Sequence, residues 1–141
     1  MSDTARQQVQ QQVIEEFRAG GGKVGGQFAG MDLLLLTTTG ARSGESRTWP
    51  LGYQREDDRL IVFAANGGRA NRPGWYFNLV ADPSATVEVG TETWPVTAVL
   101  ATGAERERLW ERQLVTTPFL AGFQAKVEWE IPVFVLTRAG V

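Results

Sequence analysis

The chain has 141 residues and a formal net charge of −2, and it contains neither cysteine nor histidine. Without cysteine there is no disulfide, thiol nucleophile or cysteine-bound metal, and without histidine there is no Ser-His-Asp triad or imidazole acid. We therefore expect an enzyme of this composition to take its chemistry from a cofactor. The charge gives no indication of nucleic-acid binding, and we predict no metal site.

The N-terminal residues 1–20 are predicted to form an amphipathic helix, because apolar residues recur at helical spacing in Val9, Val13, Ile14 and Phe17. Gly20–Gly22 would end this helix, and residues 20–30 are expected to be a flexible glycine-rich segment. Gly20–Gly25 matches the pattern G-x-G-x-x-G but follows a helix instead of a strand. A helix cap followed by a mobile lid is therefore favoured over a dinucleotide site.

The rest of the chain is dominated by strands. They are predicted over residues 33–39, 50–54, 60–65, 86–89, 92–100 and 131–137. Asp57-Asp58 and Gly90-Thr91 would turn two hairpins, and Pro95 suggests a sheet edge or a bulge. A second helix is predicted over 103–115, ending before Pro118, and a turn of helix near residues 74–79. Strands and helices do not alternate regularly, so we expect one mainly β domain of the α+β class over residues 1–141, a small antiparallel barrel with flanking helices.

Two further absences bear on location. No apolar run approaches the roughly 20 residues of a membrane-spanning helix. The first residues lack the basic and apolar regions of a signal peptide. We therefore expect a cytoplasmic protein without an integral membrane segment, and leave peripheral membrane association and oligomeric state open.

The segment 40–51 between two predicted strands carries the first candidate site. It contains two glycines, three hydroxyl side chains, and the arginines Arg42 and Arg47. Glycine-rich turns let backbone amides converge on an anion, and a guanidinium pairs with phosphate in a bidentate fork. The alternative is a polar hairpin loop with solvated arginines, and the residues alone favour the two interpretations equally.

A second glycine-rich basic segment follows the strand predicted at 60–65. Arg69 and Arg72 could bind a polyanionic group, and the aromatic residues Trp75 and Phe77 could flank a planar ring. The alternative is that the aromatic residues belong to the core and the arginines to the surface. Pairs of acidic residues elsewhere in the chain give no support to two-carboxylate catalysis.

Taken together, the motifs resemble a known family over residues 14–136. The matching positions are Arg18, Gly22, Lys23 and Val24, then 34–40 (Leu-Leu-Leu-Thr-Thr-Thr-Gly), 42–44 (Arg-Ser-Gly), Arg47, 50–51 (Pro-Leu), 67–68 (Gly-Gly), 73–79 (Pro-x-Trp-Tyr-x-Asn-Leu), 82–83 (Asp-Pro) and 131–133 (Ile-Pro-Val). Their order and spacing resemble the deazaflavin-dependent nitroreductase family, the F420-dependent reductases of actinobacteria.

The resemblance implies a split β-barrel of the FMN-binding, pyridoxamine-oxidase-like type, and coenzyme F420, a deazaflavin with a ribityl phosphate and a polyglutamate tail. It implies cofactor contacts from three segments: Ala41, Arg42, Ser43, Arg47, Thr48, Trp49, Pro50, Leu51, Gly52, Ala64, Ala65, Asn66, Gly67, Gly74, Trp75, Tyr76, Phe77 and Asn78. Charge alone suggests Lys23, Arg69 and Arg72 for the carboxylates of the tail.

The implied activity is transfer of hydride from the reduced deazaflavin to electron-poor acceptors such as quinones, enones and unsaturated lactones. Phe123 stands where the family has a tyrosine and Trp129 where it has an arginine, which leaves reduction of nitro compounds unassigned. We expect a hydrophobic substrate pocket from Phe119, Phe123 and Trp129, and assign no catalytic residue. The alternatives are an FMN- or FAD-dependent oxidoreductase on the same barrel, or a ligand carrier without turnover.

Overall fold

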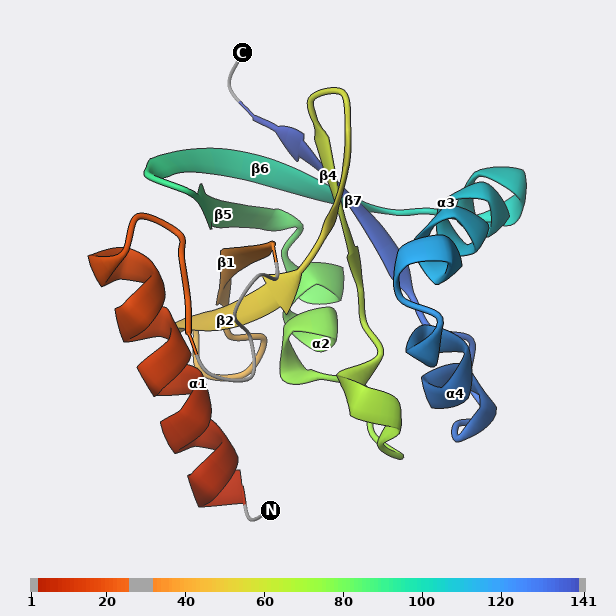
Figure 1. Ribbon diagram of the computed structural model, residues 1–141, viewed down its shortest axis with the longest axis horizontal. Coiled ribbons are helices and arrows are strands. Elements are labelled where there is room, and N and C mark those ends of the chain that lie inside the picture. The colour runs from red at the N-terminus through yellow and green to blue at the C-terminus, as the bar shows by residue number, and fades with distance from the viewer. Residues whose placement is uncertain (1–2, 26–31, 140–141) are drawn as a thin grey trace.

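The computed structural model describes residues 3–25 and 32–139. In this part of the chain the elements are α1 (Asp3–Ala19), β1 (Leu33–Thr39), β2 (Ser46–Gly52), β3 (Gln54–Glu56), β4 (Arg59–Phe63), the 3-10 turn η2 (Asn66–Gly68), α2 (Gly74–Ala81), β5 (Ser84–Val89), β6 (Glu92–Leu100), α3 (Gly103–Thr116), α4 (Phe119–Ala125) and β7 (Val133–Arg138). Figure 1 shows α1 on one side of the strands and the pair α3–α4 on the other, with α2 between them.

The strands form one antiparallel sheet in the order β2-β1-β5-β6-β7-β4-β3. The strands β2 and β3 therefore lie at opposite edges of the sheet, although Tyr53 alone separates them in the chain. The two edges can meet at one residue only if the sheet curls around on itself. The result is the split barrel with flanking helices that the resemblance implied.

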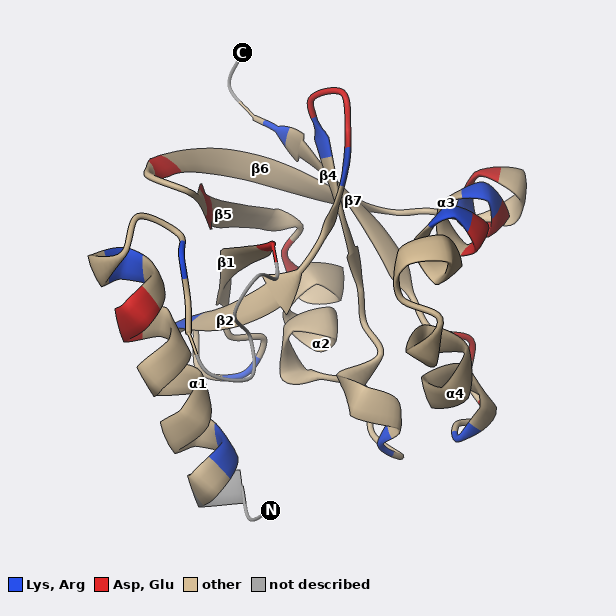
Figure 2. Cartoon of the chain, viewed as in Figure 1, with Lys and Arg blue, Asp and Glu red and all other residues tan. Residues whose placement is uncertain are grey.

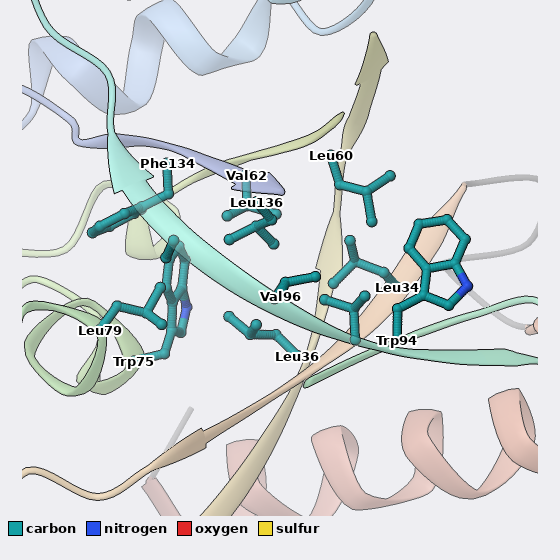
Figure 3. Close-up of a cluster of buried hydrophobic side chains, with 13 residues drawn as sticks. Leu34, Leu36, Leu60, Val62, Trp75, Leu79, Trp94, Val96, Phe134 and Leu136 are labelled. Atoms are coloured by element: carbon teal, nitrogen blue, oxygen red, sulfur yellow. The ribbon is translucent and has the colours of Figure 1, made fainter. Parts of the chain in front are cut away.

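The leucine run of β1 is continuous because this strand is buried on both faces. Leu34 and Leu36 point into the barrel, where they pack with side chains from the other strands and from α2. Figure 3 shows this core, in which Trp75 and Leu79 of α2 meet Phe134 at one end of the barrel. Leu33 and Leu35 face outward and pack beneath α1 against Val13, Ile14 and Phe17. Burial on both faces removes the polar alternation typical of a half-exposed strand.

A third apolar cluster attaches α3 and α4 to the opposite outer face. Ile61 of β4 and Val133 and Val135 of β7 are buried there against Leu109 and Trp110 of α3. Leu120 brings α4 into the same cluster. Among residues 3–25 and 32–139, no helix combines the length and apolar character that a membrane span requires.

Three elements differ from the prediction. The strand predicted over 50–54 begins at Ser46 and breaks at Tyr53 into two strands, since its polar first half pairs with Thr37–Thr39 of β1. The strand predicted over 60–65 ends at Phe63, and α4 was not predicted, because Pro118 was taken only as a stop. Proline is equally suited to the start of the next helix, where its missing N–H needs no partner.

Pro95 lies in the interior strand β6, opposite Thr86 of β5, in continuous register. Its carbonyl accepts a hydrogen bond from the Ala139 amide at 2.8 Å, beyond the last residue of β7. In an antiparallel strand the nitrogen and the carbonyl oxygen of one residue face the same neighbouring strand. The Pro95 nitrogen, which has no hydrogen to donate, therefore faces the position where the pairing of β6 with β7 has already ended. Strand β6 is interior over most of its length and has no bulge, but Pro95 lies just beyond its pairing with β7, so the proline occupies a local edge and interrupts no ladder hydrogen bond.

The triple glycine ends α1 as predicted. The Gly22 amide donates to the Phe17 carbonyl at 2.8 Å, and both Gly21 and Gly22 have positive φ. Gly22 also lies against the β5–β6 turn, where a Cβ would come within 2.8 Å of the Gly90 Cα. Gly21 and Gly22 therefore pack against that turn, and the part of the expected flexible segment over 26–30 lies outside the described residues.

Candidate functional site

A cleft of about 690 Å³ opens between strand β2 and helix α4. Strand β2 forms one wall, the loop from β4 to α2 forms the floor, and the ends of α3 and α4 form the other wall, while α1 closes one side. The cleft is lined by Arg6, Gln10, Trp49, Pro50, Leu51, Gly52, Phe63, Ala65, Asn66, Gly67, Arg69, Asn71, Arg72, Pro73, Gly74, Trp75, Gln113, Thr117, Phe119, Leu120 and Phe123. Its volume lies within the range of small-molecule and cofactor sites, roughly 300–1,000 Å³.

The two walls of the cleft are apolar. Trp49 and Leu51 of β2 form one wall, and Phe119 and Phe123 of α4 form the other. The two phenylalanine rings pack edge to face with their centroids 5.5 Å apart. Phe119 stays 56% exposed, so an apolar surface remains uncovered at the mouth of the cleft. Such walls suit a planar, largely apolar ligand.

The charged residues that line the cleft are all basic. Arg6, Arg69 and Arg72 line it, and the residues that line it include neither aspartate nor glutamate. Figure 2 shows basic residues on the loop after η2 and on the first half of α1. Positive side chains gathered in a concave, partly apolar site focus a field that attracts anionic ligands.

Arg72 is held by two aromatic rings. Its guanidinium carbon lies 4.9 Å from the centroid of Trp129 and 5.3 Å from that of Tyr76. The Trp129 indole donates a hydrogen bond to the Ala70 carbonyl at 3.0 Å, which ties the loop to the segment after α4. Within the described part of the chain Arg72 has no ion pair, and its buried Nε has no hydrogen-bond partner.

The floor of the cleft has a left-handed backbone. Asn66, Gly67 and Gly68 all have positive φ, between 49° and 77°. The Asn66 side chain donates to the Asn71 carbonyl at 2.7 Å and so closes the loop. A Cβ on Gly68 would come within 3.3 Å of Phe123, so glycine lets the loop approach α4 closely.

The predicted phosphate loop, residues 40–45, is held by hydrogen bonds to α2 and within the loop. Asn78 of α2, which is 8% exposed, accepts from the Ala41 amide at 2.9 Å and donates to Thr38 at 3.0 Å. Ser43 accepts from the Glu45 amide at 3.1 Å. Arg42 is exposed and forms no hydrogen bond or ion pair with its side chain among the described residues.

Arg47 and Thr48 line a second hollow of about 580 Å³ between β2 and the polar face of α1. This hollow and the main cleft share Gln10 and Trp49, so they adjoin.

Of the residues predicted to contact the cofactor, half line the main cleft: Trp49, Pro50, Leu51, Gly52, Ala65, Asn66, Gly67, Gly74 and Trp75. Nine others lie outside it: Ala41, Arg42, Ser43, Arg47, Thr48, Ala64, Tyr76, Phe77 and Asn78. Ala64 is buried in the barrel, whereas Phe77 is half exposed.

Of the residues predicted for the substrate pocket and for the carboxylates of the tail, some line the cleft and others do not. Phe119, Phe123, Arg69 and Arg72 line the cleft. Trp129 does not line it but contacts Arg72, and Lys23 lies beside the β5–β6 turn instead.

Sequence reasoning missed a polar group at the α3 end of the cleft. The Gln113 side chain donates to the Thr117 hydroxyl at 3.0 Å and accepts from buried Gln54 at 3.0 Å. The i, i+4 spacing of Gln113 and Thr117 was visible in the sequence, but nothing there brings Gln54 of β3 beneath them. Arg6 and Gln10 of α1 were missed because a polar helix face usually points to solvent.

Two groups with shifted pKa values lie near the seam between β2 and β3. Burial, together with the charge of Asp32, raises the pKa of Tyr53. Hydrogen bonds from Arg108 and Arg59 lower the pKa of Glu56 to about 2. Both groups lie outside the cleft, and Glu56 joins the β3–β4 hairpin to α3 through its arginines.

Comparison with known proteins agrees with this geometry. The family model described as F420H(2)-dependent quinone reductase matches residues 8–138. An F420H(2)-dependent quinone reductase of Mycobacterium tuberculosis strain H37Rv is 37% identical over 128 residues, which cover 86% of this chain and 85% of that protein. A solved F420-H2 dependent reductase (FDR-A) superposes with a TM-score of 0.69 at 38% identity, covering 74% of this chain and 93% of that one.

A more distant likeness concerns the fold alone. A putative pyridoxamine 5'-phosphate oxidase from Listeria innocua superposes with a TM-score of 0.54 at 10% identity, over 77% of this chain and 85% of that one. The split barrel is therefore common to both groups, whereas the sequence match is specific to one. The chain belongs to the F420H(2)-dependent quinone reductase family.

Proposed function

We propose that the chain reduces quinones and related conjugated acceptors in the cleft between β2 and α4. Reduced coenzyme F420 is the cofactor of the family to which it belongs. The observation that carries the proposal is the cleft itself, which combines apolar walls with three arginines and no acidic lining residue. This combination suits a planar ring with an anionic side chain and an apolar acceptor beside it.

The residues present fit that cofactor. A deazaflavin ring needs a flat apolar slot, and Trp49, Pro50 and Leu51 on β2 offer one wall of it. The buried Nε of Arg72, which has no partner among the described residues, is the kind of group that a ligand oxygen satisfies. We assign the ring to β2, η2 and the start of α2.

The phosphate is best assigned to the hollow between α1 and β2. Arg47 lines this hollow and makes no ion pair with the described residues, so its guanidinium is available for a bidentate contact. The hollow adjoins the cleft at Trp49 and Gln10, which allows one ligand to occupy both. Arg42 and Ser43 remain candidates for the same phosphate, whereas Lys23 lines neither space and so gains no support for its assignment to the tail.

The bound cofactor supplies the hydride. The chain's own residues bring the acceptor to it: the edge-to-face pair Phe119 and Phe123 binds an apolar ring and excludes water from that wall. Gln113, fixed by Gln54 and Thr117, has a second amide N–H with which it can orient an acceptor oxygen. The chain has no imidazole, so the proton that completes the reduction comes from solvent or from a hydroxyl group.

Fluorescence titration of the purified protein with coenzyme F420 and, in parallel, with FMN tests the proposal. We expect saturable binding of F420 alone, and oxidation of the reduced form when a naphthoquinone such as menadione is added. Preference for FMN would instead indicate a flavin enzyme on the same barrel. Tight binding of F420 without turnover on any acceptor would indicate a carrier.

The acceptor range beyond quinones is also part of the proposal. Enones and unsaturated lactones such as coumarins share the polarised C=C of a quinone and could bind to the same apolar wall. Rates measured on menadione and on a coumarin test this range directly. The cytoplasmic location and the single domain over residues 1–141 stay predictions.

A further inference from the structure

Arg72 is a cation of the cleft that two aromatic rings contact. Its guanidinium carbon lies within 5.3 Å of the ring centroids of both Tyr76 of α2 and Trp129, just before β7, and we call this arrangement the clamp. The two rings come from segments more than fifty residues apart, and the Trp129–Ala70 hydrogen bond holds the loop between them. The side chain is thus ordered before any ligand arrives, which lowers the entropic cost of binding.

The charge of Arg72 has no internal counterion. The carboxylates that form ion pairs in the described residues are Glu56, Glu88, Glu105, Glu107 and Glu130, and none of them contacts Arg72. Its Nε is buried and unpartnered. Leaving a charged, buried donor unsatisfied costs more than leaving a neutral one, so such a group points to a partner outside the chain.

The geometry of the clamp favours one kind of partner. Arg72 lines the cleft, and its planar guanidinium carries a fork of N–H groups. That fork matches the two oxygens of a carboxylate. Lysine in the same place would lack both the planar stack and the fork.

We propose that Arg72, in contact with the rings of Tyr76 and Trp129, is a preformed binding site for a carboxylate of a ligand in the cleft, and that Trp129 is its positioning residue. The inference rests on the proposed function and deepens it. Two ligands could bring the carboxylate: the cofactor through its tail, or an acceptor that carries an acid group.

Binding measurements distinguish these sources. F420 and the deazaflavin riboside, which has no phosphate or tail, are titrated into wild type and the variants R72A, R72K and W129L. If the tail binds the clamp, R72A weakens F420 binding about 10- to 100-fold, the range of one charged hydrogen-bonded contact, and leaves the riboside unchanged. R72K and W129L then give intermediate losses, because R72K keeps the charge but loses the fork, and W129L keeps Arg72 but removes one of its two rings.

If the acceptor binds the clamp, F420 affinity stays unchanged in R72A. The KM for a carboxylated naphthoquinone then rises about 10- to 100-fold, while that for uncharged menadione stays the same. R138A is the matched control, since Arg138 stacks on Trp94 at 4.0 Å but does not line the cleft. Thermal unfolding of each variant checks that it is folded.

The outcomes separate the clamp from the function. If wild type binds F420, and folded R72A has the same F420 affinity and the same KM for the carboxylated quinone as wild type, the clamp is overturned and the proposed function stands. Equal losses for F420 and the riboside, or equal losses in R138A, also overturn it, because they indicate a general effect on the fold. Failure of wild type to bind F420 overturns both.

Discussion

The close approach of Gly22 to Gly90 allows a quantitative test of how α1 is attached. Alanine at position 22 would have to keep a φ of +98°, and its Cβ would lie 2.8 Å from the Gly90 Cα. Alanine at position 21 would meet similar backbone strain, with φ of +64°, but only an ordinary contact of 3.4 Å with Thr91. G22A and G21A therefore differ mainly in the steric clash of the new methyl group with Gly90, which only G22A creates.

The expected magnitudes follow from these two terms. A positive φ costs alanine about 1–2 kcal/mol, and forcing a methyl group against backbone costs about 1–3 kcal/mol more. Alanine recovers about 0.4–1 kcal/mol because it restricts the unfolded chain. We expect G22A to lower the free energy of unfolding by about 2–4 kcal/mol and G21A by about 1 kcal/mol.

Urea unfolding followed by tryptophan fluorescence measures both values. A loss of about 2–4 kcal/mol is a large share of the 5–15 kcal/mol typical of a domain, so the midpoint of G22A should fall clearly below that of G21A. Equal losses in the two variants, within about 0.5 kcal/mol, would refute the clash. The double change G22A with G90A should be no better than G22A, since the Gly90 Cα remains.

Three further changes test other parts of the structure. E56Q should lower stability by about 1 kcal/mol at neutral pH, because it breaks the bonds from Arg108 and its neighbours. The Glu56 pKa is lowered to about 2 in the folded state, so the stability difference should be present above its usual value of 4.5 and vanish as the pH falls towards 2; a difference that persists at pH 2 contradicts this. N78A should cost about 1–3 kcal/mol, because the Ala41 amide loses its acceptor, and thermal unfolding of N78D, which keeps an acceptor oxygen, is the control. F123A should raise the KM for menadione while the Kd for F420 changes less than twofold; a rise in Kd alone would move this side chain to the cofactor.

The sequence predicted the fold well because its strands carry strong local signals. Gly90 and Asp57 lie in the predicted turns with positive φ, and α1 ends at the predicted glycines. The break of one predicted strand at Tyr53 could not be predicted, because it depends on which distant strand pairs with each half. The short helix α4 was missed because seven residues after a proline carry too little periodicity.

The site was predicted best where the chain is locally unusual. Asn66 and Gly67 lie on the floor of the cleft, and their glycine-rich context was visible in the sequence. The resemblance implied cofactor contacts for Asn78 and Ala64 as well, yet the structure gives them a hydrogen bond and a core position outside the cleft. A match to a family motif does not say whether a residue is needed for ligand binding or for the fold. The burial of the side chain and its hydrogen-bond partners in the structure distinguish the two roles.

The seam at Tyr53 has a consequence for the protein inside a cell. The two edges of the sheet meet at Tyr53 without a ladder of hydrogen bonds between them, and one of these edges, β2, forms a wall of the cleft. A ligand that binds only the folded chain stabilises it by RT ln(1 + [L]/Kd), and unpaired strand edges favour association with other chains. The amount of this protein that a cell maintains should therefore rise and fall with the supply of its cofactor.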